Sequence, residues 1–216
     1  IALFHLALQA DLGSERRAPV RIALVVDRRL VVDDAYERAV KLSDGIAWSL
    51  LNEAEAKALD EKLSASCQQE RISMLARVRA GTAAQRVAHR LKVLSGDGPP
   101  LIARRLRGGI PRENDWARTP SQPTVLCSTV DQVGSRLLFR GYGVSDSMKP
   151  VHAGLIGSDC LILLDEAHLA EPFRQTLGWV ERYRGEKWRR EKSSGPWGFA
   201  SLSATPGEKS KDVFSI

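Results

Sequence analysis

The sequence is poor in the residues that build disulfide frameworks, zinc sites and membrane spans. Its 216 residues include three cysteines and four histidines, and Cys67, Cys127 and Cys160 stand too far apart for a zinc-binding pattern. No apolar run approaches the roughly 20 residues that cross a bilayer. The opening segment IALFHLALQA also lacks the basic flank of a secretory signal. We therefore expect no disulfide, no zinc site, no membrane partner and a cytoplasmic location.

The composition is that of a globular domain with a basic surface. Hydrophobic residues make up 43% of the chain and charged residues 27%, which argues against disorder. The length suits one large α/β domain with a substantial core. The 32 basic residues exceed the 26 acidic ones, and the resulting net charge of +6 favours a polyanionic partner.

The segment CLILLDEAHL, residues 160–169, joins a short apolar run to two adjacent acids and a histidine. The apolar run predicts a strand of a parallel sheet, buried on both faces. Asp165 and Glu166 then lie at the carboxyl edge of that sheet, where one carboxylate can hold Mg²⁺ and its neighbour can polarise water. The alternative is that Asp165 is simply the N-cap of a helix.

A second apolar strand, GFASLSATP at residues 198–206, ends in Ser203, Ala204 and Thr205 before a proline. Two strands that end in DEAH and SAT are a more specific signal of a nucleotide-hydrolysing site than either strand alone. They favour nucleotide hydrolysis over a simple helix cap.

Basic and polar residues follow other predicted strands. Arg28 and Arg29 come after the strand at 22–26, and the run RRLRGG places Arg107 before Gly108 and Gly109. Glycines let a phosphate approach the backbone closely. The alternatives are a solvated strand end for the first pair and a turn with exposed charge for the second.

The segment from Ser128 to Phe139 predicts a helix that starts at a strand end. Its apolar residues recur at helical spacing and are expected to face the core: Val133, Leu137 and Leu138. The same spacing leaves three polar residues available for phosphate or ribose contacts, namely Thr129, Gln132 and Arg136.

Residues 41–98 are rich in helix-forming residues and predict a helical insertion. Amphipathic spacing indicates helices at 53–63 and 69–94, with a break near Gly81. Further on, the segment 183–197 mixes charge runs with two tryptophans. It predicts a solvated helix end with a tryptophan packed on the domain, although stacking of bases on Trp188 is the alternative.

DEAH and SAT, in this order and at this spacing, resemble motifs II and III of superfamily 2 helicases. The segment 21–39 resembles motif Ia, and 124–139 resembles motif Ic. Together with LRGGIPREND at 106–115 and STVDQVGSRLLFRGYGVS, the chain resembles, nearly end to end, the CRISPR-associated helicase-nuclease of type I systems, most closely the type I-U (I-G) branch.

The resemblance implies the first RecA-like lobe of an ATP-dependent DNA helicase that uses ATP and Mg²⁺. Asp165 then holds Mg²⁺ through water, Glu166 orients the attacking water, and His168 links the γ-phosphate site to SAT. The residues Ser203, Ala204 and Thr205 couple hydrolysis to movement. The single-strand path is implied to include Arg28, Arg29, Arg107, Gly108, Gly109, Thr129 and Gln132. The implied partners are single-stranded DNA in an R-loop and a CRISPR surveillance complex.

No Gly-Lys dipeptide occurs, although phosphate loops need one. We therefore expect residues 1–216 to be an incomplete RecA-like lobe, inactive alone, with the phosphate loop upstream and a second lobe downstream. The rival hypotheses are a DEAH-type motor of a restriction or repair system and a non-enzymatic DNA-binding remnant of a motor.

Overall fold

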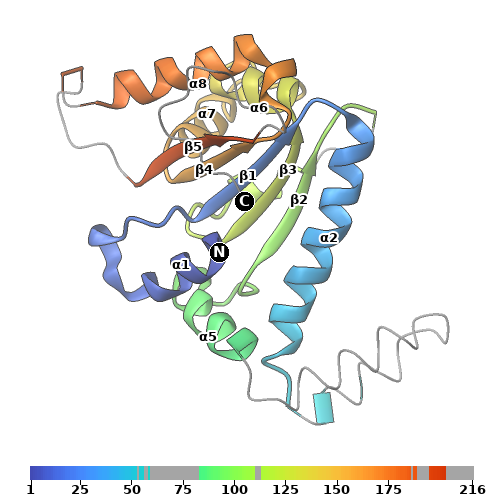
Figure 1. The fold of residues 1–216 in the computed structure, drawn as a ribbon. Helices are drawn as coiled ribbons and strands as arrows, with labels where there is room; N and C mark the ends of the chain where they lie inside the picture. Colours follow the sequence, from blue (N-terminus) through green and yellow to red (C-terminus); the bar gives the residue numbers. More distant parts are fainter. Residues whose placement is uncertain are drawn as a thin grey trace.

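The computed structural model describes residues 1–52, 54–55, 58, 83–109, 113–185, 187–188 and 195–202. They form a five-stranded, wholly parallel sheet with helices on both faces (Figure 1). The strand order is β2-β3-β1-β4-β5, with β1 at Arg21–Val26, β2 at Ile102–Leu106, β3 at Thr124–Thr129, β4 at Cys160–Leu164 and β5 at Trp197–Ser201. The predicted α/β fold is thus confirmed, and the parallel sheet is compatible with a RecA-like core.

The pairing register brings the ends of the central strands to one level. Arg21 is paired with Thr124 of β3 on one side and with Cys160 of β4 on the other. Because the strands are parallel, the residues that follow β1, β3 and β4 emerge together at one edge of the sheet. This carboxyl edge carries most of the predicted site residues.

Helix α2 (Arg29–Trp48) covers one face of the sheet, across β2 and β3 (Figure 1). Its buried residues Val32 and Ala39 pack with Val26, Ala103 and Cys127. This is the helix predicted after the first strand. It continues unbroken through residue 41, so residues 41–48 are the last turns of α2.

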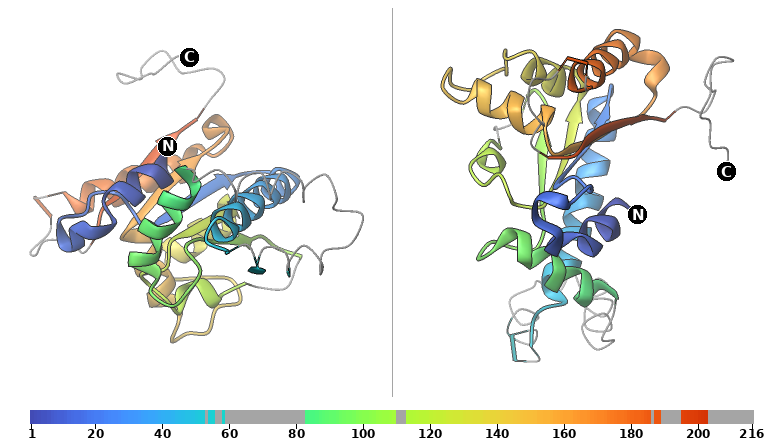
Figure 2. Two further views of the ribbon diagram at one scale, coloured as in Figure 1. Left: turned by 90° about the horizontal axis from the view of Figure 1, so that it is seen from below. Right: turned by 90° about the vertical axis from the view of Figure 1, so that its left-hand side faces the viewer.

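The opposite face is covered by α6 (Val130–Leu137), α7 (Lys149–Gly157) and α8 (Glu171–Arg184) (Figure 2). Both α7 and α8 have proline in the first turn, where its missing N–H costs nothing. Phe173 and Leu177 of α8 pack with Ile162 of β4 in the main core. Alternate residues along the strands therefore pack against two helical layers, one on each face of the sheet.

A smaller core lies at the amino end of the sheet, between α1 (Ala2–Leu8), the 3₁₀ helix η1 (Ala10–Glu15) and α5 (Ala83–Ser95) (Figures 1 and 2). Leu6 and Leu91 are fully buried there. Only 83–94 of the predicted helix at 69–94 is described, within α5. The predicted helix at 53–63 and the break at Gly81 lie largely or wholly outside the described residues.

Strand β4 departs from the prediction of burial on both faces. Its residues Cys160, Ile162 and Leu164 are buried, whereas Leu161 and Leu163, on the other face, are half-buried. The neighbouring outer strand β5 is half-buried to exposed. The reason is that α2 lies over β2 and β3, and it leaves this side of β4 and β5 less covered.

None of the helices in the described part of the chain is long and apolar enough to cross a membrane. Cys127 and Cys160 are free and buried, and burial raises the pKa of each thiol to about 12. They therefore pack as small apolar groups, as predicted. Cys67 lies outside the described residues.

Candidate functional site

The chain leaves β1 and β4 toward opposite faces of the sheet. After β1 it enters α2 on one face, and after β4 it passes through the 3₁₀ helix η4 (Ala167–Leu169) into α8 on the other. Such a switch between adjacent parallel strands is where open α/β sheets bind ligands. Asp165 and Glu166 follow β4 at this position, beside Arg28, which follows β1.

Glu166 is held in an unusual backbone conformation at the start of η4. Its φ is +48° and its ψ is +43°, the left-handed region that non-glycine residues rarely adopt. A strained residue over-determined by its surroundings is a frequent feature of functional sites. The Glu166 carboxylate lies 3.9 Å from Nε of Arg28; the Arg28 side chain is 70% exposed and the Glu166 side chain 41%. This contact is weak, so the carboxylate remains available.

Asp165 is tied to the sheet through its backbone. Its N–H donates to the carbonyl of Val25 at 2.9 Å, and its Oδ1 accepts the N–H of Glu166 at 2.9 Å. The N-cap alternative is wrong, because α8 begins only at Glu171 and Glu166 precedes η4.

The second oxygen of Asp165 has no partner among the described residues. One free carboxylate oxygen beside substrate phosphates is a donor set that suits Mg²⁺, which keeps most of its water. Within the described ranges, no group of three His, Cys, Asp or Glu side chains is arranged as a metal centre. The residues present therefore fit Mg²⁺ held through water by Asp165, and they do not form a dedicated metal cage.

The turn after β4 is bonded to the end of β5. Leu202 donates its N–H to the carbonyl of Leu164 at 2.7 Å, and the N–H of Ala167 donates to the carbonyl of Leu202 at 3.2 Å. Backbone hydrogen bonds therefore connect the DEAH turn with the residue that directly precedes SAT. His168 is exposed on η4. Ser203, Ala204 and Thr205 lie outside the described residues.

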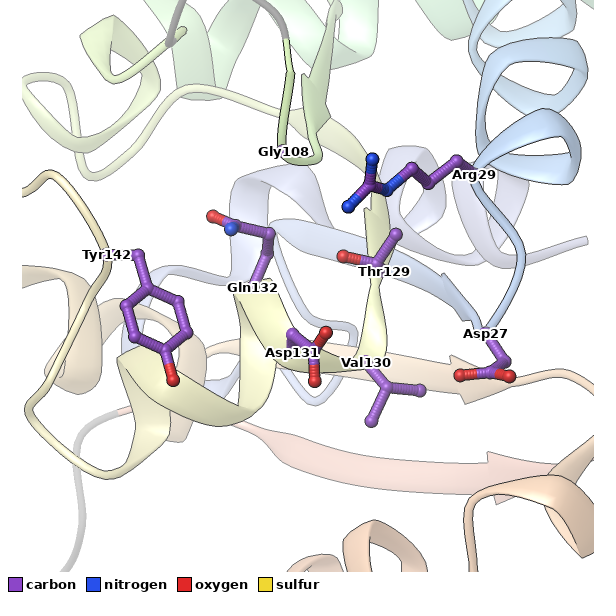
Figure 3. A pocket seen from close by; sticks show the side chains of 8 residues that line it. All are labelled: Asp27, Arg29, Gly108, Thr129, Val130, Asp131, Gln132 and Tyr142. Atoms are coloured by element: carbon purple, nitrogen blue, oxygen red, sulfur yellow. The ribbon is translucent and has the colours of Figure 1, made fainter.

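A hollow of about 130 Å³ lies along the same edge, between the ends of β1, β2 and β3 (Figure 3). The Arg29 side chain reaches from the start of α2 toward Gly108, and Thr129 and Gln132 come from the start of α6 (Figure 3). The hollow is lined by Asp27, Arg29, Gly108, Thr129, Val130, Asp131, Gln132 and Tyr142. The structure therefore brings four predicted nucleic-acid residues together: Arg29, Gly108, Thr129 and Gln132.

The first turn of α6 faces this hollow. Thr129 is the N-cap residue, and its side chain makes no capping hydrogen bond. The free backbone N–H groups of a helix start attract phosphate oxygens. Two carboxylates, Asp27 and Asp131, also line the hollow, so an anion is best placed against Arg29 and the helix start.

Arg136 was expected to be available for ligand contacts, and this prediction is wrong. Its side chain is 1% exposed, and it donates to Oε1 of Gln132 at 2.7 Å and to Nδ1 of His152 at 3.2 Å. Leu138, expected in the core, is 60% exposed. The helix ends at Leu137 and the chain turns at Phe139 with a φ of +59°, so Leu138 leaves the inward face.

Arg107 is engaged in an ion-pair network within the fold. Its Nε lies 2.7 Å from Oδ1 of Asp33 in α2, and Nη1 of Arg105 lies 2.8 Å from the same oxygen. The hydrogen bond from Arg107, aided by the bond from Arg105, holds the pKa of Asp33 below its ordinary value. Gly109 has a φ of +83°, which glycine adopts without strain. This network fixes the loop after β2 on α2.

Four lining residues were not among the predicted site residues: Asp27, Val130, Asp131 and Tyr142. Asp27 and Asp131 each adjoin a predicted site residue, so their positions at strand and helix ends were a usable signal. Tyr142 is a single tyrosine in a loop, 57% exposed, and nothing in the sequence placed that loop beside α6.

Comparison of the chain with protein-family models, with curated proteins and with solved structures gives no match.

Proposed function

We propose that this chain is part of the first RecA-like lobe of an ATP-dependent DNA helicase that acts in type I CRISPR interference. The observation that carries the proposal is the shared carboxyl edge. It places the Asp165–Glu166 pair and a polar hollow with Arg29 and the start of α6 on adjacent strand ends. A nucleotide-hydrolysing motor needs its hydrolytic acids close to its DNA contacts, because hydrolysis has to change how tightly the protein holds the DNA strand.

Each residue has a role that its surroundings support. Asp165 is anchored by Val25 with one oxygen free, which suits a water-mediated contact to Mg²⁺. Mg²⁺, when bound with ATP, neutralises charge that develops on the phosphates. Glu166 is half-buried and weakly paired, so its carboxylate can accept a hydrogen bond from the attacking water and position it.

The hollow supplies the proposed contact to single-stranded DNA. Arg29 gives a guanidinium for a phosphate, and the free N–H groups of α6 give neutral donors. Arg28 stands between the two functions. It lies 3.9 Å from Glu166, so a DNA phosphate that binds Arg28 is held next to the Asp165–Glu166 pair.

The substitution Glu166→Gln in the gene product that carries this chain tests the proposal. The amide keeps the size of the side chain but cannot act as a base, so DNA-stimulated ATP hydrolysis should fall by about a hundredfold or more. ATP binding should remain, since Glu166 is not proposed to hold the nucleotide. The readout is phosphate release with and without single-stranded DNA.

Glu15→Gln in η1 is the matched control, because it also removes one solvent-accessible carboxylate but lies at the amino end of the sheet. It should hydrolyse ATP at the unchanged rate. Undiminished turnover in Glu166→Gln removes Glu166 from the mechanism. A wild-type protein that binds DNA in a salt-sensitive way without hydrolysing ATP supports the DNA-binding remnant instead.

The role in CRISPR interference comes from the sequence resemblance and has its own test. Cells that carry the matching CRISPR system should lose interference against a targeted plasmid when Glu166→Gln replaces the wild type. Interference that persists in the Glu166→Gln strain favours a motor from a restriction or repair system.

A further inference from the structure

The outer surface of α8 carries an exposed group of aromatic and basic side chains. We call it the aromatic platform and define it as Trp179, Arg182, Tyr183, Lys187 and Trp188. The rings of Trp179 and Tyr183 stack with centroids 5.9 Å apart, and Tyr183 meets Trp188 edge to face at 5.5 Å. The three rings form one continuous contact chain across the end of the helix.

Two cations lie over these rings. The Arg182 guanidinium is 4.9 Å from the centroid of Trp179 and 5.8 Å from that of Trp188. The Lys187 ammonium is 6.0 Å from the centroid of Trp188. Cation–π contacts of this kind favour this arrangement of rings and charges before any ligand arrives.

The backbone explains how the platform forms. Trp179, Arg182 and Tyr183 are three and four residues apart, so they share one face of α8. The helix ends at Arg184, and the N–H of Gly185 and of Trp188 bond back to the carbonyls of Arg182 and Gly185, both at 3.1 Å. This turn folds Trp188 back onto the helix.

The platform contributes little to the folded core. Trp179 is 49% exposed, Tyr183 is 56% exposed and Trp188 is 51% exposed. By contrast, Trp116 is fully buried, and Trp197 donates its Nε1–H to the carbonyl of Ile156. The tryptophan that packs on the domain is therefore Trp197, and the expectation of a solvated helix end does not account for three adjoining exposed rings.

The platform is also remote from the carboxyl edge. Helix α8 starts just after the DEAH turn and runs back along the sheet, and Arg184 donates to the carbonyl of Gly157 just before β4 at 2.6 Å. At about 1.5 Å per residue, the 14 residues of α8 span about 20 Å. A ligand on the platform is thus outside the hollow.

We propose that the aromatic platform binds single-stranded nucleic acid by base stacking. About half of each aromatic residue's surface remains exposed and can take a base of any kind, and the guanidinium and ammonium groups over the rings attract the phosphates. The charge agrees with this partner, because six basic residues stand against three acidic ones from Trp179 to Lys192. A duplex does not suit the platform, since its bases are already stacked on one another.

Binding of a fluorescein-labelled oligothymidine to the 216-residue chain, without nucleotide, tests the proposal. Fluorescence anisotropy should show about tenfold weaker binding for Trp188→Ala and for Trp179→Ala, in line with the loss of one stacked base. Trp188→Phe should retain part of the affinity because it keeps a ring. Unlabelled oligothymidine should quench the tryptophan emission of the wild type, and the quenching should shrink in both alanine variants.

Matched controls come from the other end of the chain. Phe4→Ala removes a ring that is 54% exposed, and Arg17→Ala removes an exposed cation for comparison with Arg182→Ala. Neither control should change the affinity. Circular dichroism establishes that each variant is folded.

Oligothymidine affinity and quenching that are the same in wild type and Trp179→Ala/Trp188→Ala overturn the proposal and leave the platform to a protein partner. Equal losses for single strand and for duplex also overturn it, because they indicate charge alone. The test is separate from the proposed function: Glu166→Gln leaves the platform intact, and a failed ATPase test leaves the quenching unchanged.

Discussion

The two edges of the sheet carry similar charged residues but use them differently. At the amino edge, Arg16 and Asp159 are in direct contact within the fold. At the carboxyl edge, the arginines after β1 and the carboxylates after β4 approach one another loosely. The difference separates charges that hold the structure from charges that remain available to a ligand.

Asp159 organises the amino edge. Its two oxygens accept bonds from Arg16 at 2.9 and 2.6 Å, and Oδ1 also accepts the N–H of Val20 at 2.8 Å. Arg21 is 2% exposed and donates to the carbonyls of Asp159 and Pro120. A bidentate, partly buried pair of this kind is costly to break, because one charge is then left without its partner.

The carboxyl edge contains both kinds of charge. Arg105 and Arg107 share Asp33 within the fold. Arg28 is 70% exposed along its side chain, and among the described residues its ion-pair contact is the 3.9 Å approach to Glu166. Its pairing energy is at most a fraction of that of Asp159 with Arg16, since exposed pairs contribute little. At this edge, Arg105 and Arg107, at the end of β2, are therefore structural charges. Arg28, which follows β1, is available to a ligand.

The largest expected effect is on stability at the amino edge. Asp159→Ala should lower the free energy of unfolding by about 3 kcal/mol, because it leaves the Arg16 guanidinium without its carboxylate partner and the Val20 N–H without an acceptor. Asp159 also has a φ of +51°, which alanine tolerates less well than aspartate. Urea unfolding followed by circular dichroism measures the change.

Glu166→Ala is the matched control at the other edge, since it also truncates an acid with positive φ next to an arginine. It should alter the free energy of unfolding by no more than about 0.5 kcal/mol. If the two substitutions cost the same, the distinction between the two edges is wrong.

The sequence predicted the sheet and the edge residues because both depend on local patterns. Apolar runs such as Cys160–Leu164 mark strands, and polar residues after them must meet at one edge of a parallel sheet. Gly108, Thr129 and Gln132 were found in this way, and they do line one hollow.

What the sequence could not supply was the partner of each charge. Helical spacing left Arg136 outside, yet His152 and Asn114, from other segments, accept its hydrogen bonds inside the fold. Likewise Asp33 pairs with Arg107 from 74 residues away. Such pairings depend on tertiary packing and leave no periodic trace in the sequence.

A buried histidine in α7 is a further group whose charge state the fold controls. His152 is 0% exposed, accepts a bond from Arg136 and meets the ring of Trp116 at 4.8 Å. Burial, aided by the Arg136 charge, lowers the pKa of His152 to about 4. The folded protein therefore keeps this histidine neutral at pH values where the unfolded chain binds a proton.

The sign of the pH effect follows from this shift. Because the unfolded state binds the extra proton, stability is complete above the unfolded pKa of about 6.5 and is lost as the pH falls toward 4. Between about pH 7.5 and pH 5 this group should remove about 2 kcal/mol from the free energy of unfolding. His152→Gln, which keeps an acceptor for Arg136, should flatten that part of the profile. A profile that is equally steep in the variant assigns the acid sensitivity to other groups.

The smallest expected effect is on the salt dependence of single-strand binding, compared between two arginines of the carboxyl edge. If Arg28 contacts a DNA phosphate, Arg28→Ala should make the salt dependence of single-strand binding shallower by about 0.7 in the log–log slope. Arg107→Ala should change that slope much less, because Asp33 already holds the Arg107 guanidinium. Arg107→Ala should instead lower stability, since it removes part of the network that joins β2 to α2. Titrations of labelled oligothymidine at several salt concentrations give both slopes. Equal slope changes would mean that Arg107 also contacts the DNA strand, as the sequence resemblance implies.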